Sequence, residues 1–273
     1  MYRVAETVRG HIRGMREALA SLIFSAPCRI CARMLDTGSR VPFCHDCLEA
    51  LQEPLREPLC AGCGRPIVSS AVTEGTSAPK CHVCRNRPYR FDLARSFSAY
   101  TPRMSRAILL LKYGKVTPLG GWFARRLASL VERHPEDFSA DVVIPVPLDQ
   151  GRLRERGFNQ AELIARPLAR LLGIPFRSYL LVRTKPRPNH HRLTLRERWE
   201  TVRGAYATHQ SARVDKLRVL LLDDVFTTGA TLDACALALK GAGAARVVGL
   251  TVARALPLYP ASEAGLADQD FGE

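Results

Sequence analysis

Three patterns are absent from the sequence, and each absence argues against a class of protein. No apolar run in the 273 residues approaches the roughly 20 residues that a transmembrane helix needs. The first residues do not follow the pattern of a secretory signal peptide. The loop G-x-x-x-x-G-K-[ST] of nucleotide hydrolases is also missing, because the Gly-Lys pair at Gly114 is followed by valine. We therefore expect a cytoplasmic protein that has no membrane span and is no P-loop hydrolase.

Residues 1–24 predict an N-terminal amphipathic helix. Apolar side chains recur there at helical spacing, with arginines between them: Val4, Val8, Ile12, Met15, Leu19, Leu22 and Ile23. Such a helix either docks its apolar stripe on the rest of the protein or lies on a membrane surface. We favour docking, and the second interpretation leaves a membrane-peripheral location open.

The charge balance is strongly basic. Lysine and arginine total 40 against 26 acidic residues, which gives a net charge of +14. The stretch from Leu148 to Arg203 holds 13 basic residues and five acidic ones. This excess favours an anionic partner, and both phosphorylated metabolites and single-stranded DNA qualify.

Eight of the nine cysteines form four C-x-x-C pairs: Cys28/Cys31, Cys44/Cys47, Cys60/Cys63 and Cys81/Cys84. Two such turns can supply the four thiolates of a tetrahedral zinc site, and a complete set of protein ligands makes the metal structural. Disulfides fit poorly without an export signal. A redox C-x-x-C normally occurs once, at the start of a helix after a strand. We predict two structural Zn²⁺ ions. Pairing in sequence order is the simplest arrangement, and interleaved pairing stays open.

The stretch VLLLDDVFTTGATL, residues 219–232, predicts a ligand site. A buried strand ends in Asp223 and Asp224, and a helix begins near Thr231. Ligands of parallel α/β sheets bind at this edge, and a helix N-terminus favours an anion. The loop between strand and helix is small and rich in hydroxyls: Val225, Thr227, Thr228, Gly229, Ala230 and Thr231. A ribose 5-phosphate would place its diol on the acids and its phosphate in the loop. The alternatives are a Walker B strand, which lacks its partner loop, and a strand with two solvated acids.

Together with LKYGK, IPVPL and RERGFNQA, the four cysteine pairs and this stretch resemble the ComF family over roughly residues 25–255. That family joins a double zinc ribbon to a type I phosphoribosyltransferase domain. The resemblance implies an α/β fold, with a central parallel sheet and helices on both faces. It also implies binding of phosphoribosyl pyrophosphate (PRPP) with Mg²⁺, in which Asp223 and Asp224 are catalytic and contact the ribose hydroxyls. The rest of the implied site is the 225–231 loop on the 5-phosphate, with Pro145, Val146, Arg154, Arg156 and Asn159 around the pyrophosphate.

We expect four parts in the chain. They are an amphipathic helix (1–24), a double zinc ribbon (25–90), a phosphoribosyltransferase domain (91–258) and a loose acidic tail (259–273). A mobile basic segment within the third part offers Lys185 or Arg187 to close over the pyrophosphate. The chain departs from the family pattern at His190, where glutamine is usual, and at Thr201, where asparagine is usual.

Three functions are compatible with these features. The chain is an enzyme that transfers a phosphoribosyl group to an unidentified acceptor, a non-catalytic protein that binds PRPP or single-stranded DNA, or an assembly factor. In the last case the zinc ribbons dock a DNA-uptake protein or a helicase. The family's link to natural competence fits all three.

Overall fold

The computed structural model describes residues 26–35, 40–67, 79–86, 88–186, 194–210 and 213–256. The chain divides into two compact units, Met1–Gln52 and Glu53–Glu273. The helix expected over 1–24 and the tail expected from 259 lie outside the described residues. Among the helices that are described, none has the length and apolar character needed to cross a membrane.

The first unit is built around one group of cysteines. An isolated antiparallel bridge joins Pro27 to Met34 and flanks the first C-x-x-C turn. The short helix α2 (His45–Ala50) begins inside the second C-x-x-C pair, with Cys44 as its N-cap residue and Cys47 in its first turn.

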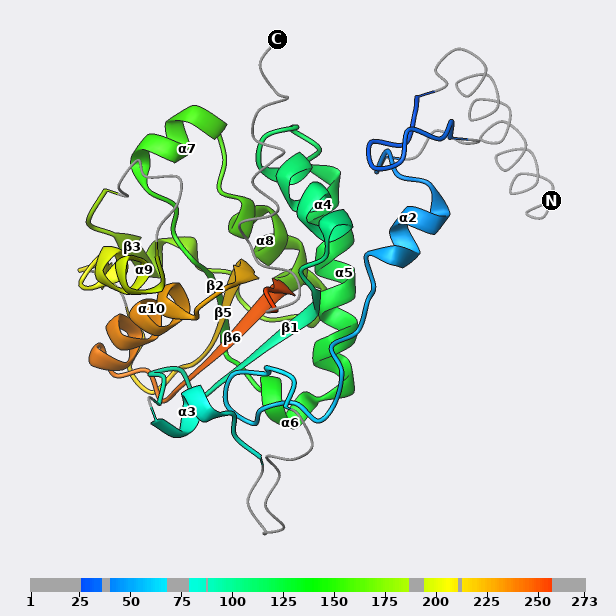
Figure 1. Ribbon diagram of the computed structural model, residues 1–273. Helices are drawn as coiled ribbons and strands as arrows, with labels where there is room; N and C mark the ends of the chain where they lie inside the picture. The colour runs from blue at the N-terminus through cyan, green and yellow to red at the C-terminus, as the bar shows by residue number, and fades with distance from the viewer. Residues whose placement is uncertain are drawn as a thin grey trace, which may run out of the picture. The chain divides into compact units, whose positions relative to one another are not determined.

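The second unit holds a four-stranded parallel sheet (Figure 1). The strand order is β1 (Leu93–Ala99), β6 (Arg246–Arg254), β5 (Arg218–Phe226) and β2 (Val142–Pro145). Leu222 of β5 lies opposite Pro145 of β2 and Leu250 of β6. This register places the acid pair of β5 just beyond the last paired residue of β2, at the carboxyl edge of the sheet.

Helices cover both faces of the sheet (Figure 1). On one side lie α4 (Pro102–Lys112), α5 (Pro118–Arg133) and α8 (Gln160–Leu172), with the short α6 (Pro135–Phe138) after α5. On the other side lie α10 (Ala230–Gly241) and α9 (Leu195–Val202). The small antiparallel pair β3 (Leu181–Arg183) and β4 (Tyr206–Thr208) accompanies them, and η2 (Ser178–Leu180) precedes β3. This is the α/β architecture expected from the sequence.

The second group of cysteines belongs to the core of the sheet unit. Cys60, Cys63, Cys81 and Cys84 pack in the same apolar cluster as Phe91, Leu221 and Phe226. The short helix α3 (His82–Asn86) carries Cys84. The compact units therefore divide at residues 52/53, between the two cysteine groups, whereas the sequence motifs place a boundary at 90/91. The four-part scheme based on motifs stays a prediction.

The sequences of 91–100, 141–148 and 246–254 predict strands, which are present, and the helix after the threonine loop begins at Ala230. The sequence before α8 predicts a basic, glycine-containing turn, and this prediction is wrong. The stretch forms a helix of its own, α7 (Gln150–Arg156). The Asp149 side chain caps it by accepting from the Arg152 N–H, and Gly157, with φ 78°, ends it.

Candidate functional site

Two adjacent carboxyls lie at the carboxyl end of β5. Asp223 is half-buried and Asp224 is buried. The Asp223 carboxylate accepts from the N–H of Asp224, and the Asp224 carboxylate accepts from the N–H of Val225. Burial, together with the charge of Asp224, raises the pKa of Asp223 well above its ordinary value. Placing charge on both neighbouring carboxyls is therefore costly unless a cation lies beside them.

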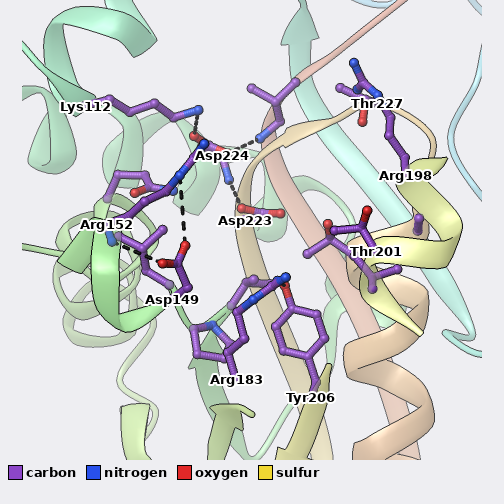
Figure 2. A pocket seen from close by; sticks show the side chains of 18 of the residues that line it. Lys112, Asp149, Arg152, Arg183, Arg198, Thr201, Tyr206, Asp223, Asp224 and Thr227 are labelled. Atoms are coloured by element: carbon purple, nitrogen blue, oxygen red, sulfur yellow. Dashed lines mark hydrogen bonds and ion pairs between the residues drawn. The ribbon is translucent and has the colours of Figure 1, made fainter. Parts of the chain in front are cut away.

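Lys112, the last residue of α4, is the counter-ion of this pair. Its ammonium lies 2.5 Å from Oδ2 of Asp224 (Figure 2). Burial opposes the charge on both groups, but their mutual attraction outweighs it. The attraction lowers the pKa of Asp224 and raises the pKa of Lys112. The site therefore carries its own half-buried cation against the acid that should face a ligand.

The loop from Thr227 to Thr231 joins β5 to α10. Gly229 adopts φ 79° as the N-cap residue of α10, in a conformation that side chains rarely tolerate. Gly229 has no side chain of its own to cap the helix. The Thr228 hydroxyl accepts from the N–H of Ala230. The first turn of α10 thus keeps further backbone donors for an anion.

Basic side chains of α7 form the opposite wall. Arg156 is buried, donates to the Gln160 side chain at 3.0 Å and to the Tyr113 hydroxyl at 2.7 Å, and stacks on the Tyr113 ring. Arg152 lies one helical turn before it and faces the same cleft. These contacts fix the Arg156 guanidinium in place beside the acids.

Asn159 positions the loop after β2. Its amide donates to the Val146 carbonyl at 3.0 Å, and its side-chain oxygen accepts from the N–H of Ala161 at the start of α8. Asn159 therefore ties the Pro-Val-Pro loop to the helix without lining the cavity.

The last wall comes from α9 and the β3–β4 pair. Arg183 donates to the Tyr206 hydroxyl at 2.6 Å, and Arg198 and Thr201 of α9 face the same space (Figure 2). The cleft is open to solvent and has a volume of about 260 Å³. It combines acids, hydroxyls and guanidinium groups.

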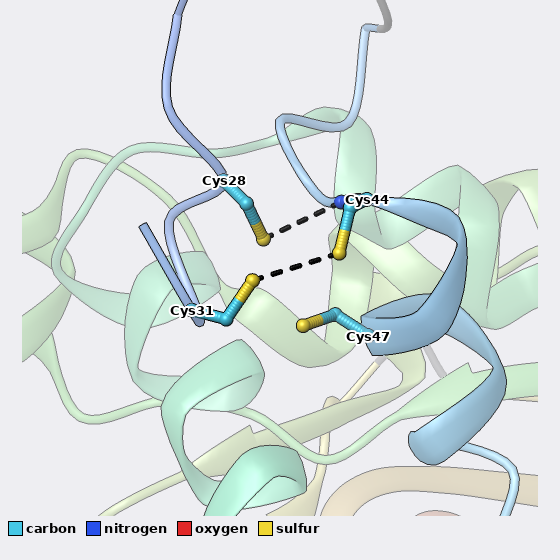
Figure 3. A group of neighbouring side chains, drawn as sticks. All are labelled: Cys28, Cys31, Cys44 and Cys47. Carbon is cyan, nitrogen blue, oxygen red and sulfur yellow. Dashed lines mark hydrogen bonds between the residues drawn. The ribbon is translucent and has the colours of Figure 1, made fainter. Parts of the chain in front are cut away.

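The first cysteine group gathers four sulfurs around one point (Figure 3). Cys31 and Cys44 are 3.6 Å apart at Sγ, and the Cys44 N–H donates to Sγ of Cys28. All ligand atoms of the group, which is completed by Cys47, lie within 4.8 Å of one another. A tetrahedral zinc site with Zn–S near 2.3 Å places its sulfurs ~3.8 Å apart, so the donor set fits the metal.

The second group repeats this geometry inside the core. Cys63 and Cys81 are 3.7 Å apart at Sγ, and the Cys81 N–H donates to Sγ of Cys60. Hydrogen bonding with Cys63 and Cys84 lowers the pKa of Cys60, whereas hydrogen bonding with Cys60 raises the pKa of Cys84. Four thiolates this close require a cation between them. The pairs combine in sequence order, as predicted, and interleaved pairing is wrong.

No family model matches the sequence. The DNA utilization protein YhgH of Salmonella typhi is 31% identical over 223 residues, which cover 81% of this chain and 93% of that protein. The chain belongs to the ComF family. Competence protein F of Haemophilus influenzae is 28% identical over 211 residues, which cover 72% of this chain and 90% of that protein.

The solved structures similar to this ComF-family chain include the glutamine PRPP amidotransferase from B. subtilis complexed with ADP and GMP. It is 22% identical, covers 50% of this chain and 26% of that chain, and has a TM-score of 0.33. The larger unit has the α/β architecture that the resemblance to the family implies. Its sheet is parallel with helices on both faces, and the threonine loop follows the acid pair at the carboxyl edge.

The structure brings most of the predicted ligand residues of the ComF-family chain to one cleft. The lining includes Asp223, Asp224, Val225, Thr227, Thr228, Ala230, Thr231, Val146 and Arg156. Gly229 and Pro145 shape the backbone without lining the cavity, and Arg154 is exposed away from it. Lys185 donates to the Arg203 carbonyl, and Arg187 and His190 lie outside the described residues.

Several lining residues of the cleft were not predicted as ligand contacts: Lys112, Tyr113, Asp149, Arg152, Gln160, Arg183 and Tyr206. For three of these residues the sequence contains a pattern that could have predicted their place in the cleft. Lys112 and Tyr113 belong to the LKYGK motif, and Arg152 precedes Arg156 by one helical turn. Thr201, where the chain departs from the family pattern, lines the cleft together with Arg198.

Proposed function

We propose that this ComF-family chain binds PRPP together with Mg²⁺ in the cleft and transfers the phosphoribosyl group to a nitrogen acceptor. One observation carries the proposal. The buried acid pair, the threonine loop at the start of α10 and several guanidinium groups line the same cavity. A vicinal diol, a phosphate and a pyrophosphate each find a complementary surface there.

Each part of the ligand has a proposed partner. Asp223 and Asp224 accept hydrogen bonds from the two ribose hydroxyls. The Thr227–Thr231 loop and the first turn of α10 hold the 5-phosphate. Arg152 and Arg156 face the pyrophosphate, for which paired N–H donors are suited.

The proposed reaction forms a bond between the acceptor nitrogen and the anomeric carbon and breaks the bond from that carbon to pyrophosphate. The acceptor proton leaves to solvent or to a base. The guanidinium groups of α7 stabilise negative charge on the leaving group, and the acids hold the sugar for displacement. Carboxylate oxygens suit Mg²⁺, which when bound neutralises the pyrophosphate and orients it.

A double substitution tests this assignment. Asp223→Asn with Asp224→Asn keeps the size of the side chains and removes their charge. We expect PRPP affinity to fall by on the order of 3–6 kcal/mol, at ~1.5–3 for each lost charge-assisted contact. Calorimetry with Mg²⁺ measures it. The exposed Asp215→Asn is the matched control and should bind as the wild type does. Unchanged affinity in the double variant would refute the role of the acids.

The names of the relatives support a place in DNA uptake or use, and we propose this role for the chain as well. The guanidinium groups facing the cleft, Arg152, Arg183 and Arg198, favour a second candidate function, in which single-stranded DNA binds without sequence preference. Neutralisation of the DNA phosphates by arginine side chains should then dominate the binding. The logarithm of the affinity should therefore fall linearly with the logarithm of the salt concentration, with a slope of ~0.7 per phosphate contacted.

Fluorescence anisotropy of a labelled oligonucleotide across a salt series measures this dependence. Excess PRPP should compete if the two ligands share the cleft. Absence of binding at low salt would remove DNA from the partners. An affinity that does not change with salt concentration would mean that contacts other than ion pairs with the phosphates hold the DNA strand.

A further inference from the structure

We propose that the second cysteine group positions the phosphate loop through Tyr89, so that metal at this group controls how tightly the cleft holds a phosphate. The inference rests on the proposed function, because it concerns the same loop. The support that Tyr89 gives to the loop can also be tested in the folded chain without any ligand. The proposal assigns Tyr89 as a positioning residue and gives the second metal a task that the first lacks.

Tyr89 contacts the loop directly. Its hydroxyl donates to the Thr228 carbonyl at 2.9 Å across 139 residues of sequence. A Cβ on Gly229 would meet the Tyr89 ring at 2.8 Å and the Phe226 ring at 2.6 Å. The tightest part of the loop therefore rests on two aromatic rings, and Tyr89 adds a hydrogen bond to that support.

This hydrogen bond fixes the direction of a peptide group. In a trans peptide the C=O and the following N–H point in opposite directions. Holding the Thr228 carbonyl on Tyr89 therefore aims the Gly229 N–H the other way. Without the phenol the 228–229 peptide loses the hydrogen bond that sets its orientation, and the neighbouring loop residues that line the cleft, such as Thr228 and Ala230, are held less firmly.

Tyr89 is in turn held beside the second cysteine group. It follows Cys84 by five residues, and its ring stacks on Phe91 with centroids 4.6 Å apart. The next residue, Arg90, donates its backbone N–H to the Asp233 carboxylate on α10. The segment after the metal knuckle is thus fastened to α10 on the far side of the loop as well.

Arg254 connects the second cysteine group with Phe226, one of the two aromatic rings beneath the loop. This arginine at the end of β6 is 1% exposed. It donates to the Cys63 carbonyl and, at 3.4 Å, to Sγ of Cys63. Its guanidinium also lies 4.1 Å from the centroid of the Phe226 ring. The second cysteine group, the rings of Tyr89 and Phe226, and the loop therefore form one continuous set of contacts.

A conservative substitution tests the coupling. Tyr89→Phe keeps the ring and removes the hydroxyl. We expect amide hydrogen exchange of residues 226–232 to accelerate, and the affinity for inorganic phosphate and PRPP to weaken on the order of 2- to 10-fold, as expected for one neutral hydrogen bond. Tyr179→Phe, at an exposed tyrosine, is the matched control and should change neither quantity.

The metal arm compares the two cysteine groups in the full chain. Cys84→Ser should remove one zinc and weaken phosphate binding on the order of 10-fold or more, because apparent affinity scales with the fraction of competent loops. Cys47→Ser, in the other compact unit, should also remove one zinc but leave loop exchange and affinity unchanged. If Cys84→Ser does not fold, the comparison of Tyr89→Phe with Tyr179→Phe still tests the coupling.

The outcomes separate the two claims. If wild-type protein binds neither phosphate nor PRPP, the proposed function fails, and the exchange comparison alone judges the coupling. Loop amides that exchange as slowly in Tyr89→Phe as in Tyr179→Phe, with equal affinities, overturn the coupling. Faster exchange confined to the loop in Tyr89→Phe and Cys84→Ser supports it.

Discussion

At the scale of single residues, the cleft is governed by one ammonium and two carboxyls. Lys112 pairs with Asp224, while burial beside Asp224 raises the pKa of Asp223. The ribose hydroxyls of the proposed ligand would meet acids that already have an internal cation. Removing one partner of a buried pair leaves an uncompensated charge, which costs far more than the pair itself contributes.

Lys112→Met tests this balance through stability. We expect the free energy of unfolding to fall by about 3 kcal/mol at neutral pH, because Asp224 is left as an unpaired buried charge. The Lys112 ammonium lowers the folded-state pKa of Asp224, so the stabilisation is present above the unfolded value of 3.8 and is lost as the pH falls through the folded value. The loss in Lys112→Met should therefore shrink in acid. Urea unfolding across a pH series measures it.

A double-mutant cycle with Asp224→Asn provides the control. The second substitution removes the charge that Lys112 compensates, so Lys112→Met should cost much less in that background. Equal costs in both backgrounds would contradict the ion pair as the source of the effect.

The sequence predicted the acids and not their counter-ion for a physical reason. Asp223 and Asp224 are local to a strand and a loop whose order is visible in 14 consecutive letters. The partner Lys112 is more than a hundred residues away, and only the packing of α4 beside the sheet brings it to Asp224. The same holds for Tyr206, which reaches the cleft through the pairing of β3 with β4.

At the scale of elements, α9 is a short helix that forms one wall of the cleft and packs against α10. It has eight residues and carries Arg198 and Thr201 into the lining. Its start is held by a capping box, in which the Thr194 side chain accepts from the Glu197 N–H and the Glu197 carboxylate accepts from the Thr194 N–H. The stability of a helix this short depends on capping interactions at its ends.

Thr194→Ala should destabilise this wall. Losing an N-cap hydroxyl costs ~1 kcal/mol, so the amides of 195–202 should exchange on the order of 5-fold faster. Hydrogen exchange read by mass spectrometry is the measurement. Ser129→Ala, which removes a hydroxyl bonded back to Arg125 within the 16-residue α5, serves as the comparison and should alter little. A similar response of both helices would rule out the cap as the cause.

The regular elements followed from local patterns because the signals were strong. Buried strands appear as continuous apolar runs, and α8 ends at Gly173, because glycine readily adopts the left-handed conformation found there. The helix α7 was missed because its cap, Asp149, follows a proline-rich loop that suggests a turn. The second cysteine group's place in the core was not visible, since cysteine spacing identifies ligands but says nothing of what packs around them.

At the scale of the whole molecule, the metal content is the simplest quantity to check. Two groups of four cysteines predict two zinc ions per chain. Elemental analysis of protein prepared without chelator should give a ratio near two, and Cys28→Ser or Cys60→Ser should each lower it to one. Folded wild-type protein with a ratio near zero would contradict both sites.

The unequal burial of the two cysteine groups has a kinetic consequence. Cys31 is exposed and Cys44 half-buried, whereas all four thiols of the second group are buried. Chelators and oxidants reach exposed sulfur directly, but they reach buried sulfur only when the surrounding structure opens. Ageing in air should therefore strip the first site at a rate set by solvent access. The second site should keep its metal for as long as its unit stays folded, so a preparation that has fallen to one zinc per chain is expected to retain an intact cleft.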